Sequence, residues 1–205
     1  MALFASGQGT NVKNILRYAR EVDLHLNFRC IITDNPQAPV LRVGEEFDLP
    51  VKVIRPAASA PGQMATKEKY ETEILEYLST MDIHWIFLCG FMRILGKTLL
   101  TSFYDEELKQ NRIINIHPAY LPEFPGKNSY ERAYHSSQKE SGVTVHFVDG
   151  GVDTGKIILQ QRFPKIDREN IADFVKRGQQ LEYALYRKVV KKVSDYQKGE
   201  TVWSS

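Results

Sequence analysis

Short apolar runs alternate with helix-spaced apolar stripes through the first hundred residues, and few folds accommodate that alternation. Four runs rich in β-branched and aromatic residues are predicted strands: residues 2–5, 28–33, 51–54 and 85–89. Two stripes predict helices between them, one from Val12 to Ala19 and one from Tyr70 to Met81. Strands that alternate with helices form a parallel sheet whose faces the helices cover, so the class is α/β.

The second half of the chain extends this pattern differently. A short helix is predicted near residues 97–103, and a fifth strand over 112–117 ends at Pro118. Two further strands, 143–148 and 157–163, flank a glycine-rich turn, which predicts an antiparallel pair. A long helix with an apolar stripe from Ile171 to Val189 follows, with Gly178 as its expected weak point. We therefore expect an open, mostly parallel, twisted sheet of Rossmann-like form, flanked by helices, with an antiparallel C-terminal addition.

Composition limits the class of partner. The 205 residues are 42% apolar and 25% charged, which are ordinary values for one globular domain spanning 1–205. A formal net charge of +2 gives too weak a field to predict a nucleic-acid partner, so small-molecule ligands are expected. Cys30 and Cys89 lie inside apolar runs, and the sequence has neither a leader nor an apolar run near 18 residues. These features predict a cytoplasmic protein that does not enter a membrane.

A glycine-containing turn follows the first strand. Residues 6–11 lie between a predicted strand and a predicted helix, where backbone N–H groups and the helix dipole favour a bound phosphate. The dinucleotide fingerprint requires a third glycine where Val12 stands, although Asp34 has the place of a ribose-binding acid. A mononucleotide phosphate is the favoured ligand, and a tight turn capped by Asn or Thr is the alternative.

Two polar side chains share one face of the fifth strand. Asn115 and His117 are two residues apart, so both point the same way at the end where open α/β sheets bind ligands. An amide donor can stabilise a developing oxyanion, and an imidazole can move protons near neutral pH. A histidine satisfied by backbone at a strand end is the alternative.

A carboxylate in the glycine-rich turn completes a candidate acid–base group. Asp153 near an imidazole would raise the pKa of the ring and orient it, with His146 as the other nearby titratable side chain. As an alternative, an aspartate in such a turn serves only to form it. His117, His146 and Asp153 also match the residue types of a two-His-one-carboxylate iron site, but no local spacing supports one. We expect no metal.

Four motifs occur in order along the chain: Ser-Gly-Gln-Gly-Thr-Asn at 6–11, Gly-Phe-Met-Arg-Ile-Leu at 90–95, Asn-Ile-His-Pro-Ala-Tyr-Leu-Pro at 115–122, and Val-His-Phe-Val with Val-Asp-Thr-Gly at 145–155. Together they resemble the glycinamide ribonucleotide formyltransferases. The third and fourth mark the wider superfamily that uses 10-formyltetrahydrofolate.

The resemblance implies a reaction and a division of the chain. A formyl group passes from 10-formyltetrahydrofolate to the amine of glycinamide ribonucleotide, in purine biosynthesis, without a covalent enzyme intermediate. Asn115 and His117 meet the oxyanion, and the His117–Asp153 pair assists proton transfer. Residues 1–100 would form the nucleotide-phosphate-binding half, and residues 101–205 the folate-binding and catalytic half.

The same likeness implies the binding residues. The ribonucleotide phosphate is expected at Gly9, Thr10 and Asn11, with Lys67 assisting. Met92 and Glu182 would contact the same substrate, with Glu182 on its ribose. The folate pocket is expected to be lined by Phe91, Arg93, Ile94, Leu95, Gly150, Gly151 and Val152.

The sequence departs from the family at the predicted acceptor side. Tyr183 and Arg187 stand where the family has His and Pro, and residues 127–130 also differ. A formyltransferase acting on another amine, such as an amino-sugar nucleotide, is therefore one alternative. A non-catalytic module that binds a phosphate ligand is another. The length argues against the larger formyltransferases that act on transfer RNA and against the folate hydrolases with a regulatory domain.

Overall fold

The computed structural model describes residues 1–24, 26–56, 67–200 and 203. The strands are β1 (Ala2–Phe4), β2 (Cys30–Thr33), β3 (Val51–Val53), β4 (Ile86–Leu88), β5 (Tyr104–Asp105), β6 (Gln110–Asn111), β7 (Ile113–His117), β8 (Glu140–Phe147) and β9 (Ile157–Pro164). The helices are α1 (Thr10–Glu21), α2 (Val40–Phe47), α3 (Lys67–Ser79), α4 (Lys97–Ser102), α5 (Ser129–His135) and α6 (Ile171–Gln197).

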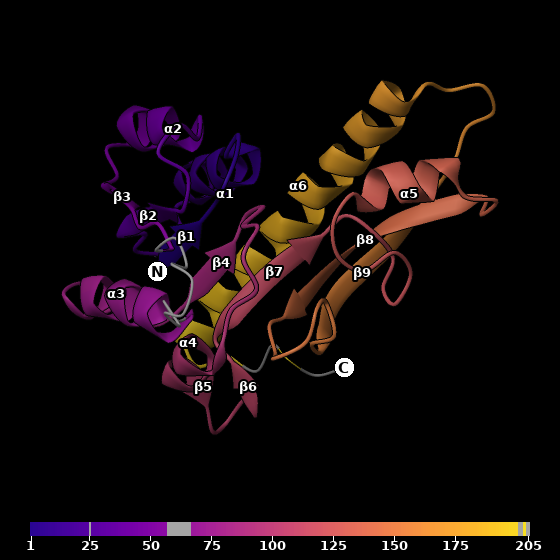
Figure 1. The fold of residues 1–205 in the computed structure, drawn as a ribbon. Coiled ribbons are helices and arrows are strands. Elements are labelled where there is room, and N and C mark those ends of the chain that lie inside the picture. Colours follow the sequence, from indigo (N-terminus) through magenta and orange to yellow (C-terminus); the bar gives the residue numbers. More distant parts are fainter. Residues whose placement is uncertain (25, 57–66, 201–202, 204–205) are drawn as a thin grey trace, which may run out of the picture.

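Seven strands form one sheet in the order β3-β2-β1-β4-β7-β8-β9 (Figure 1). The first five of these are parallel, whereas β8 pairs antiparallel with β7, and β9 pairs antiparallel with β8. β5 and β6 form a separate two-stranded antiparallel ribbon. The predicted α/β class, the mostly parallel sheet and the antiparallel C-terminal addition are confirmed.

The strands alternate side chains between two buried faces. Leu3, Phe87 and Ile114 point to the face covered by α1, α2 and α6, and Phe4 and Leu88 point to the face covered by α3 and α4. Because both faces are covered, the parallel strands are continuous apolar runs. Ile113 lies on the α3 and α4 face, so the alternation places Asn115 and His117 on that face of β7 too.

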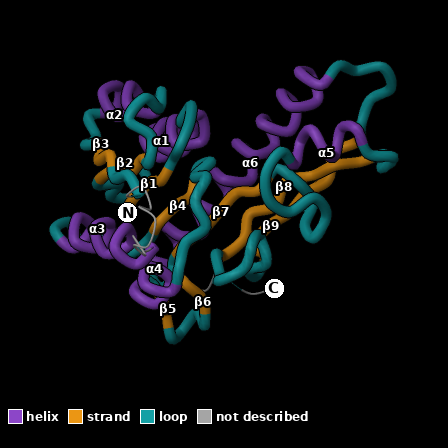
Figure 2. The backbone as a smooth tube through the Cα atoms, in the orientation of Figure 1, coloured by secondary structure: helices purple, strands orange, loops and turns teal. Residues whose placement is uncertain are grey.

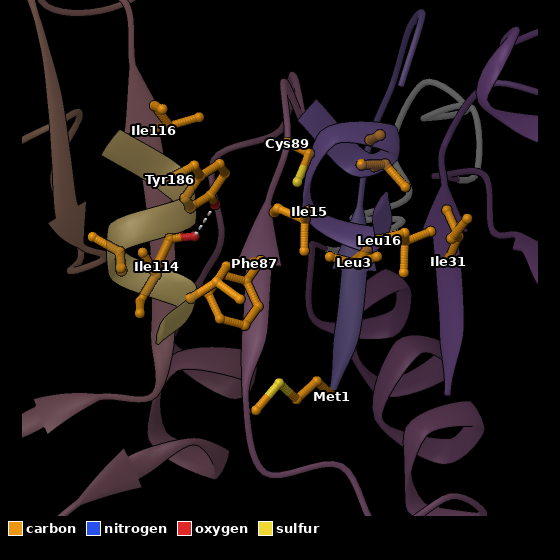
Figure 3. Packing of buried hydrophobic residues seen from close by; sticks show 14 of the residues in the cluster. Met1, Leu3, Ile15, Leu16, Ile31, Phe87, Cys89, Ile114, Ile116 and Tyr186 are labelled. Carbon is orange, nitrogen blue, oxygen red and sulfur yellow. Dashed lines mark hydrogen bonds between the residues drawn. The ribbon is translucent and has the colours of Figure 1, made fainter. Parts of the chain in front are cut away.

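The long helix α6 crosses the back of the sheet and joins its two halves. Its Tyr186 hydroxyl donates to the carbonyl of Leu88 at 2.7 Å. It also donates to the carbonyl of Ile114 at 3.2 Å (Figure 3). Leu88 belongs to β4 and Ile114 to β7, so one buried side chain contacts both strands beneath the predicted site. Nearer its N-terminus, α6 packs against α5 and β9 in a third apolar cluster, formed by Phe174, Ala133 and Phe163.

The structure also contains elements that the sequence did not predict. Helices α2 and α5 and the β5–β6 ribbon were missed, and β8 begins three residues before the predicted strand. Helix α6 is continuous through Gly178, the predicted weak point. The ring of Tyr130 from α5 lies over Gly178, and a Cβ there would sit 2.3 Å from Tyr130 Cε1. The glycine therefore makes room for a neighbouring side chain.

Candidate active site

A cavity of about 480 Å³ opens between the end of β7, the segment after β4 and the turn after β8. It brings together most of the predicted site residues: Asn11, Phe91, Met92, Arg93, Ile94, Leu95, Asn115, His117, Gly151, Val152, Asp153 and Glu182. These residues come from segments far apart in the chain. The sheet thus gathers the four sequence motifs around one space.

Asp153 lies at the centre of the predicted catalytic group. Its Oδ2 is 3.2 Å from Nδ1 of His117, and its Oδ1 is 3.4 Å from the amide nitrogen of Asn115. The Asp153 backbone is left-handed, with φ of 55°, which turns the carboxylate back over β7. Three side chains predicted from two distant segments therefore meet within hydrogen-bonding range.

His146 is the fourth member of this group. Its Nδ1 lies 2.8 Å from the carbonyl oxygen of Phe147, which can only accept, so Nδ1 carries a hydrogen. In the neutral ring its Nε2 accepts from the Asn115 amide at 3.2 Å, and in the protonated ring the same nitrogen faces Asp153 Oδ1 at 3.5 Å as a donor. Asn115 thus donates to both His146 and Asp153, which fixes its amide nitrogen toward the cavity. The β8–β9 pairing shifts register at Val145/His146, a feature common beside active sites.

The protonation of His117 is set by its surroundings. Its Nε2 is 2.9 Å from the carbonyl oxygen of Phe124, so this nitrogen also carries a hydrogen. The residue is only 4% exposed, and burial lowers the pKa of His117 although the Asp153 charge acts in the opposite direction. Burial alone would raise the pKa of Asp153, but its contacts with His146, the Gly126 N–H and His117 outweigh this effect and lower it. A proton can therefore be exchanged at Nδ1, the ring nitrogen that faces the Asp153 carboxylate.

The loop after β7 supports this pair from one side. It passes over β8, where Thr144 accepts from the Leu121 N–H at 3.0 Å, before reaching α5 (Figure 2). The Gly126 N–H donates to Asp153 Oδ2 at 2.7 Å, and Arg132 donates to the Phe124 carbonyl at 2.9 Å. Arg132 also donates to the carbonyls of Pro125 and Lys127. One arginine therefore holds the segment whose backbone contacts both His117 and Asp153.

The predicted phosphate turn has the geometry of an anion site. Gly9 caps α1 with φ of 71°, and a Cβ there would lie 2.5 Å from Val40 Cγ2, so only glycine fits. Glycine has no side chain to occupy the N–H groups of the first helical turn, which leaves them available to a ligand. Thr10 is exposed, whereas Asn11 is buried and lines the cavity.

Glu182 lies where the turn meets the cavity. Its Oε2 accepts from Asn11 Nδ2 at 2.7 Å, and its Oε1 accepts from the Tyr130 hydroxyl at 2.5 Å. Burial raises the pKa of Glu182, although both hydrogen bonds act to lower it. The carboxylate therefore joins the phosphate turn to α5.

The predicted folate-lining residues form an apolar wall. Ile94 and Val152 are 57% and 45% exposed and border the cavity, as does Met92, which is predicted to contact the ribonucleotide and is 56% exposed. Apolar side chains left exposed around a concave space are typical of a ligand site. Arg93 forms an ion pair with Asp34 at 2.6 Å. The Asp34 carboxylate therefore holds the segment of residues 90–95 and is not free to bind a ribose.

Four predicted residues do not line this cavity. Gly9 and Thr10 lie at the start of α1. Lys67, at the start of α3, and Gly150 line a neighbouring cavity of about 470 Å³, which shares Leu95 with the first. This position puts Lys67 beside the folate-lining segment and does not bring it together with Asn11. Its assignment to the ribonucleotide phosphate stays a prediction, as does the role of every other site residue.

Within the described ranges, no group of His, Cys, Asp or Glu has the arrangement of a metal site. His117, His146 and Asp153 do come together, but they do not form such a group. In the same ranges, no helix is long and apolar enough to span a membrane.

Sequence reasoning missed several residues around the cavity. Tyr130 donates to Glu182, and the Gly126 N–H donates to Asp153. Arg132 donates to the Phe124 carbonyl, which His117 also contacts. Lys127, Asn128 and Ser129 line the cavity itself. The signal available was their position directly after the Asn-x-His-Pro motif, which marks a loop near the site.

Comparison with known proteins agrees with this geometry. The formyl transferase family model matches residues 1–190. The phosphoribosylglycinamide formyltransferase of Bacillus subtilis is 34% identical over 94% of this chain and 93% of its own length, and that of Haemophilus influenzae is 30% identical over 93% and 85%.

Solved structures agree as well. The phosphoribosylglycinamide formyltransferase of Bacillus halodurans superposes with a TM-score of 0.86 at 34% identity, covering 100% of this chain and 98% of that one. The glycinamide ribonucleotide transformylase 1 of Geobacillus kaustophilus has a TM-score of 0.82 at 38% identity, covering 94% and 96%. On the family match and these relatives, the chain belongs to the formyl transferase family.

Proposed function

We propose that this chain transfers a formyl group from 10-formyltetrahydrofolate to the amine of glycinamide ribonucleotide, a step of purine biosynthesis. The observation that carries the proposal is the contact of Asp153 with His117, beside Asn115, in a cavity that extends to the phosphate turn. The names of the relatives support the choice of substrates.

The reaction follows from where these side chains lie. The amine nitrogen attacks the formyl carbon, and the carbonyl oxygen gains a negative charge. Asn115 and His117 stabilise that charge by hydrogen bonding when they exchange a present partner, such as His146 or the Phe124 carbonyl, for the substrate oxygen. The attacking nitrogen then loses a proton, the bond from carbon to folate N10 breaks, and N10 gains a proton. The His117–Asp153 pair accepts and returns protons in these steps.

Each end of the cavity suits one substrate. The N–H groups after Gly9 and the helix dipole of α1 favour the phosphate, with Glu182 as an acceptor for ribose hydroxyls. Phe91, Ile94, Leu95 and Val152 offer apolar surface for the flat ring of a folate. The fit of the folate rests on this apolar wall beside the catalytic group.

An assay of substrate use tests the proposal. Purified protein is mixed with 10-formyltetrahydrofolate and glycinamide ribonucleotide, and release of deformylated folate is followed by absorbance. Release only when the amine is present is the expected result. Release without amine would mean hydrolysis, and release with an amino-sugar nucleotide alone would mean a different acceptor. Phosphate-ligand binding without any release would favour the non-catalytic alternative.

The proposed setting follows from the same features. Two buried free thiols, Cys30 and Cys89, fit a reducing compartment, and we place the protein in the cytoplasm. Its proposed partners are the two small-molecule substrates, with neither nucleic acid nor a membrane involved.

A further inference from the structure

Tyr130 contacts the acceptor side of the site without lining the cavity. Its hydroxyl donates to Glu182 Oε1 at 2.5 Å, and Glu182 is 7% exposed. Hydrogen bonds to ionised groups are stronger than neutral ones, and a buried carboxylate needs such partners. The Tyr130 hydroxyl and the Asn11 amide supply one to each oxygen.

The chain keeps a space for the Tyr130 ring. The ring lies against Gly178, one helical turn before Glu182, where any larger residue would meet Tyr130 Cε1. It also packs edge-on against Phe174, at 6.1 Å between ring centroids. The ring is therefore fixed from two directions, and its hydroxyl can reach only the Glu182 side of α6.

We propose that Tyr130 is a positioning residue for the acceptor substrate, acting through Glu182. It holds the Glu182 carboxylate so that the remaining lone pairs face an acceptor with adjacent hydroxyls, as in a ribose. This inference rests on the proposed function, in which Glu182 contacts the ribose. It assigns a role to one of the positions, 127–130, at which the sequence departs from the family.

A purely structural role for Tyr130 is the competing explanation, and the chain offers a matched control. Tyr134 is one turn along the same helix, and its ring also packs on Phe174, at 5.5 Å. Its hydroxyl donates to the carbonyl of Glu169 at 2.7 Å instead of to Glu182. Tyr130→Phe and Tyr134→Phe therefore remove the same atom from the same cluster, and only the first removes a contact to the site.

Steady-state kinetics with each substrate varied separately separates the two explanations. Tyr130→Phe should raise the KM for glycinamide ribonucleotide about tenfold or more, the effect of losing a hydrogen bond to a charged group. The KM for the folate should change less than about twofold. Tyr134→Phe should leave both KM values within about twofold of wild type. Equal effects of the two variants would overturn the proposal.

A second variant, on α6, displaces the Tyr130 ring without removing its hydroxyl. Gly178→Ala should displace the Tyr130 ring and raise the same KM, again without changing that of the folate. A change confined to kcat, or shared by both substrates, would count against positioning.

A measurement without substrate separates this inference from the proposed function. Carbon-13 NMR of labelled glutamate follows the titration of Glu182 in wild type and in both tyrosine variants, with Glu182→Gln to assign the signal. Loss of the Tyr130 hydrogen bond should move the titration of Glu182 to higher pH, and Tyr134→Phe should not. If wild type does not formylate glycinamide ribonucleotide, the proposed function fails. An unchanged Glu182 titration in Tyr130→Phe overturns the positioning role in either case.

Discussion

At the scale of single residues, Asp153 carries most of the predicted chemistry. Asp153→Asn keeps the shape of the side chain but removes the charge that faces His117 at 3.2 Å. We expect kcat to fall by about 10²–10⁴-fold, the usual worth of general acid–base catalysis. Steady-state kinetics checks this, with Asp149→Asn in the same turn as the control. A kcat within about threefold of wild type would rule out Asp153 as part of the proton-transfer pair.

The lowered pKa of His117 predicts that the stability of the protein depends on pH. Burial lowers its pKa in the folded protein, so the unfolded chain binds a proton there first as the pH falls. The contribution of His117 to the free energy of unfolding is therefore complete above the pKa of an unfolded histidine, about 6.5. It is lost as the pH falls from there through the lower pKa of the folded protein. Because the pKa of Asp153 is also lowered in the folded protein, protonation of this carboxylate at still lower pH further decreases the free energy of unfolding.

Urea unfolding at a series of pH values measures this effect. The free energy of unfolding should decline on acidification from about pH 7 to 5, and His117→Asn should make that decline shallower. His84→Asn removes an imidazole that lies outside the site and serves as control. An equally steep decline in His117→Asn would contradict the assigned pKa direction.

Residue pairs on one strand were predictable, whereas contacts between segments were not. Asn115 and His117 follow from the two-residue period of a strand, which needs no tertiary information. Local sequence left two interpretations of Asp153, a catalytic carboxylate or a turn former, because nothing local indicates that its turn folds back over β7. The family resemblance favoured the first. His146 was noticed only as a nearby titratable group, and its contact with Asn115 depends on the register of β7 with β8.

At the scale of elements, Arg132 on α5 links a helix to the catalytic loop. Its guanidinium holds three carbonyls of the segment from Phe124 to Lys127. Phe124 and Asn128 have φ of 51° and 55°, conformations that cost energy for residues other than glycine. These hydrogen bonds therefore stabilise a backbone that would otherwise relax away from His117.

Arg132→Gln should lower kcat by about tenfold, since small misplacements of catalytic groups cost that much or more. The control is Arg162→Gln, which breaks an ion pair to Glu123 on the same loop but does not touch residues 124–127. Kinetics of both variants decides the point. If the two lose activity equally, the loop as a whole matters and the Arg132 contacts do not.

The elements that were predicted share one physical property. The parallel strands are buried on both faces, so their sequences are apolar runs that stand out from their surroundings. Helix α2 was missed although Val40, Val43 and Phe47 recur at helical spacing, because eight residues are too few for the pattern to stand out. Helix α5 has seven residues, only two of them buried, and so has no clear apolar period. The strand order depends on crossovers between distant segments, which short-range patterns do not encode.

At the scale of the whole molecule, we propose that the two halves fold as one unit. One buried cluster includes Leu3 and Phe87 from the first half, and Ile114, Val145 and Val189 from the second. Tyr186 adds hydrogen bonds to β4 and β7 at the boundary (Figure 3). A core shared in this way predicts a single unfolding transition.

Tyr186→Phe should lower the free energy of unfolding by about 1–2 kcal/mol, since two buried carbonyls lose a donor. The urea m-value should stay unchanged, because the same surface is exposed on unfolding. Tyr104→Phe, at an exposed tyrosine, is the control. Two separate transitions in the variant would show that the halves are independent.

The position of α5 limits how such a site can diversify. Residues within and just before this seven-residue helix contact the proton-transfer pair through Gly126 and the acceptor side through Tyr130. A mutation that shifts the helix to admit a new amine therefore disturbs the chemistry at the same time. Selection for another acceptor would meet less resistance from changes on α6, whose Tyr183 and Arg187 already differ from the family pattern. In such a lineage, exchange of substrates would begin on the long helix and leave the short one in place.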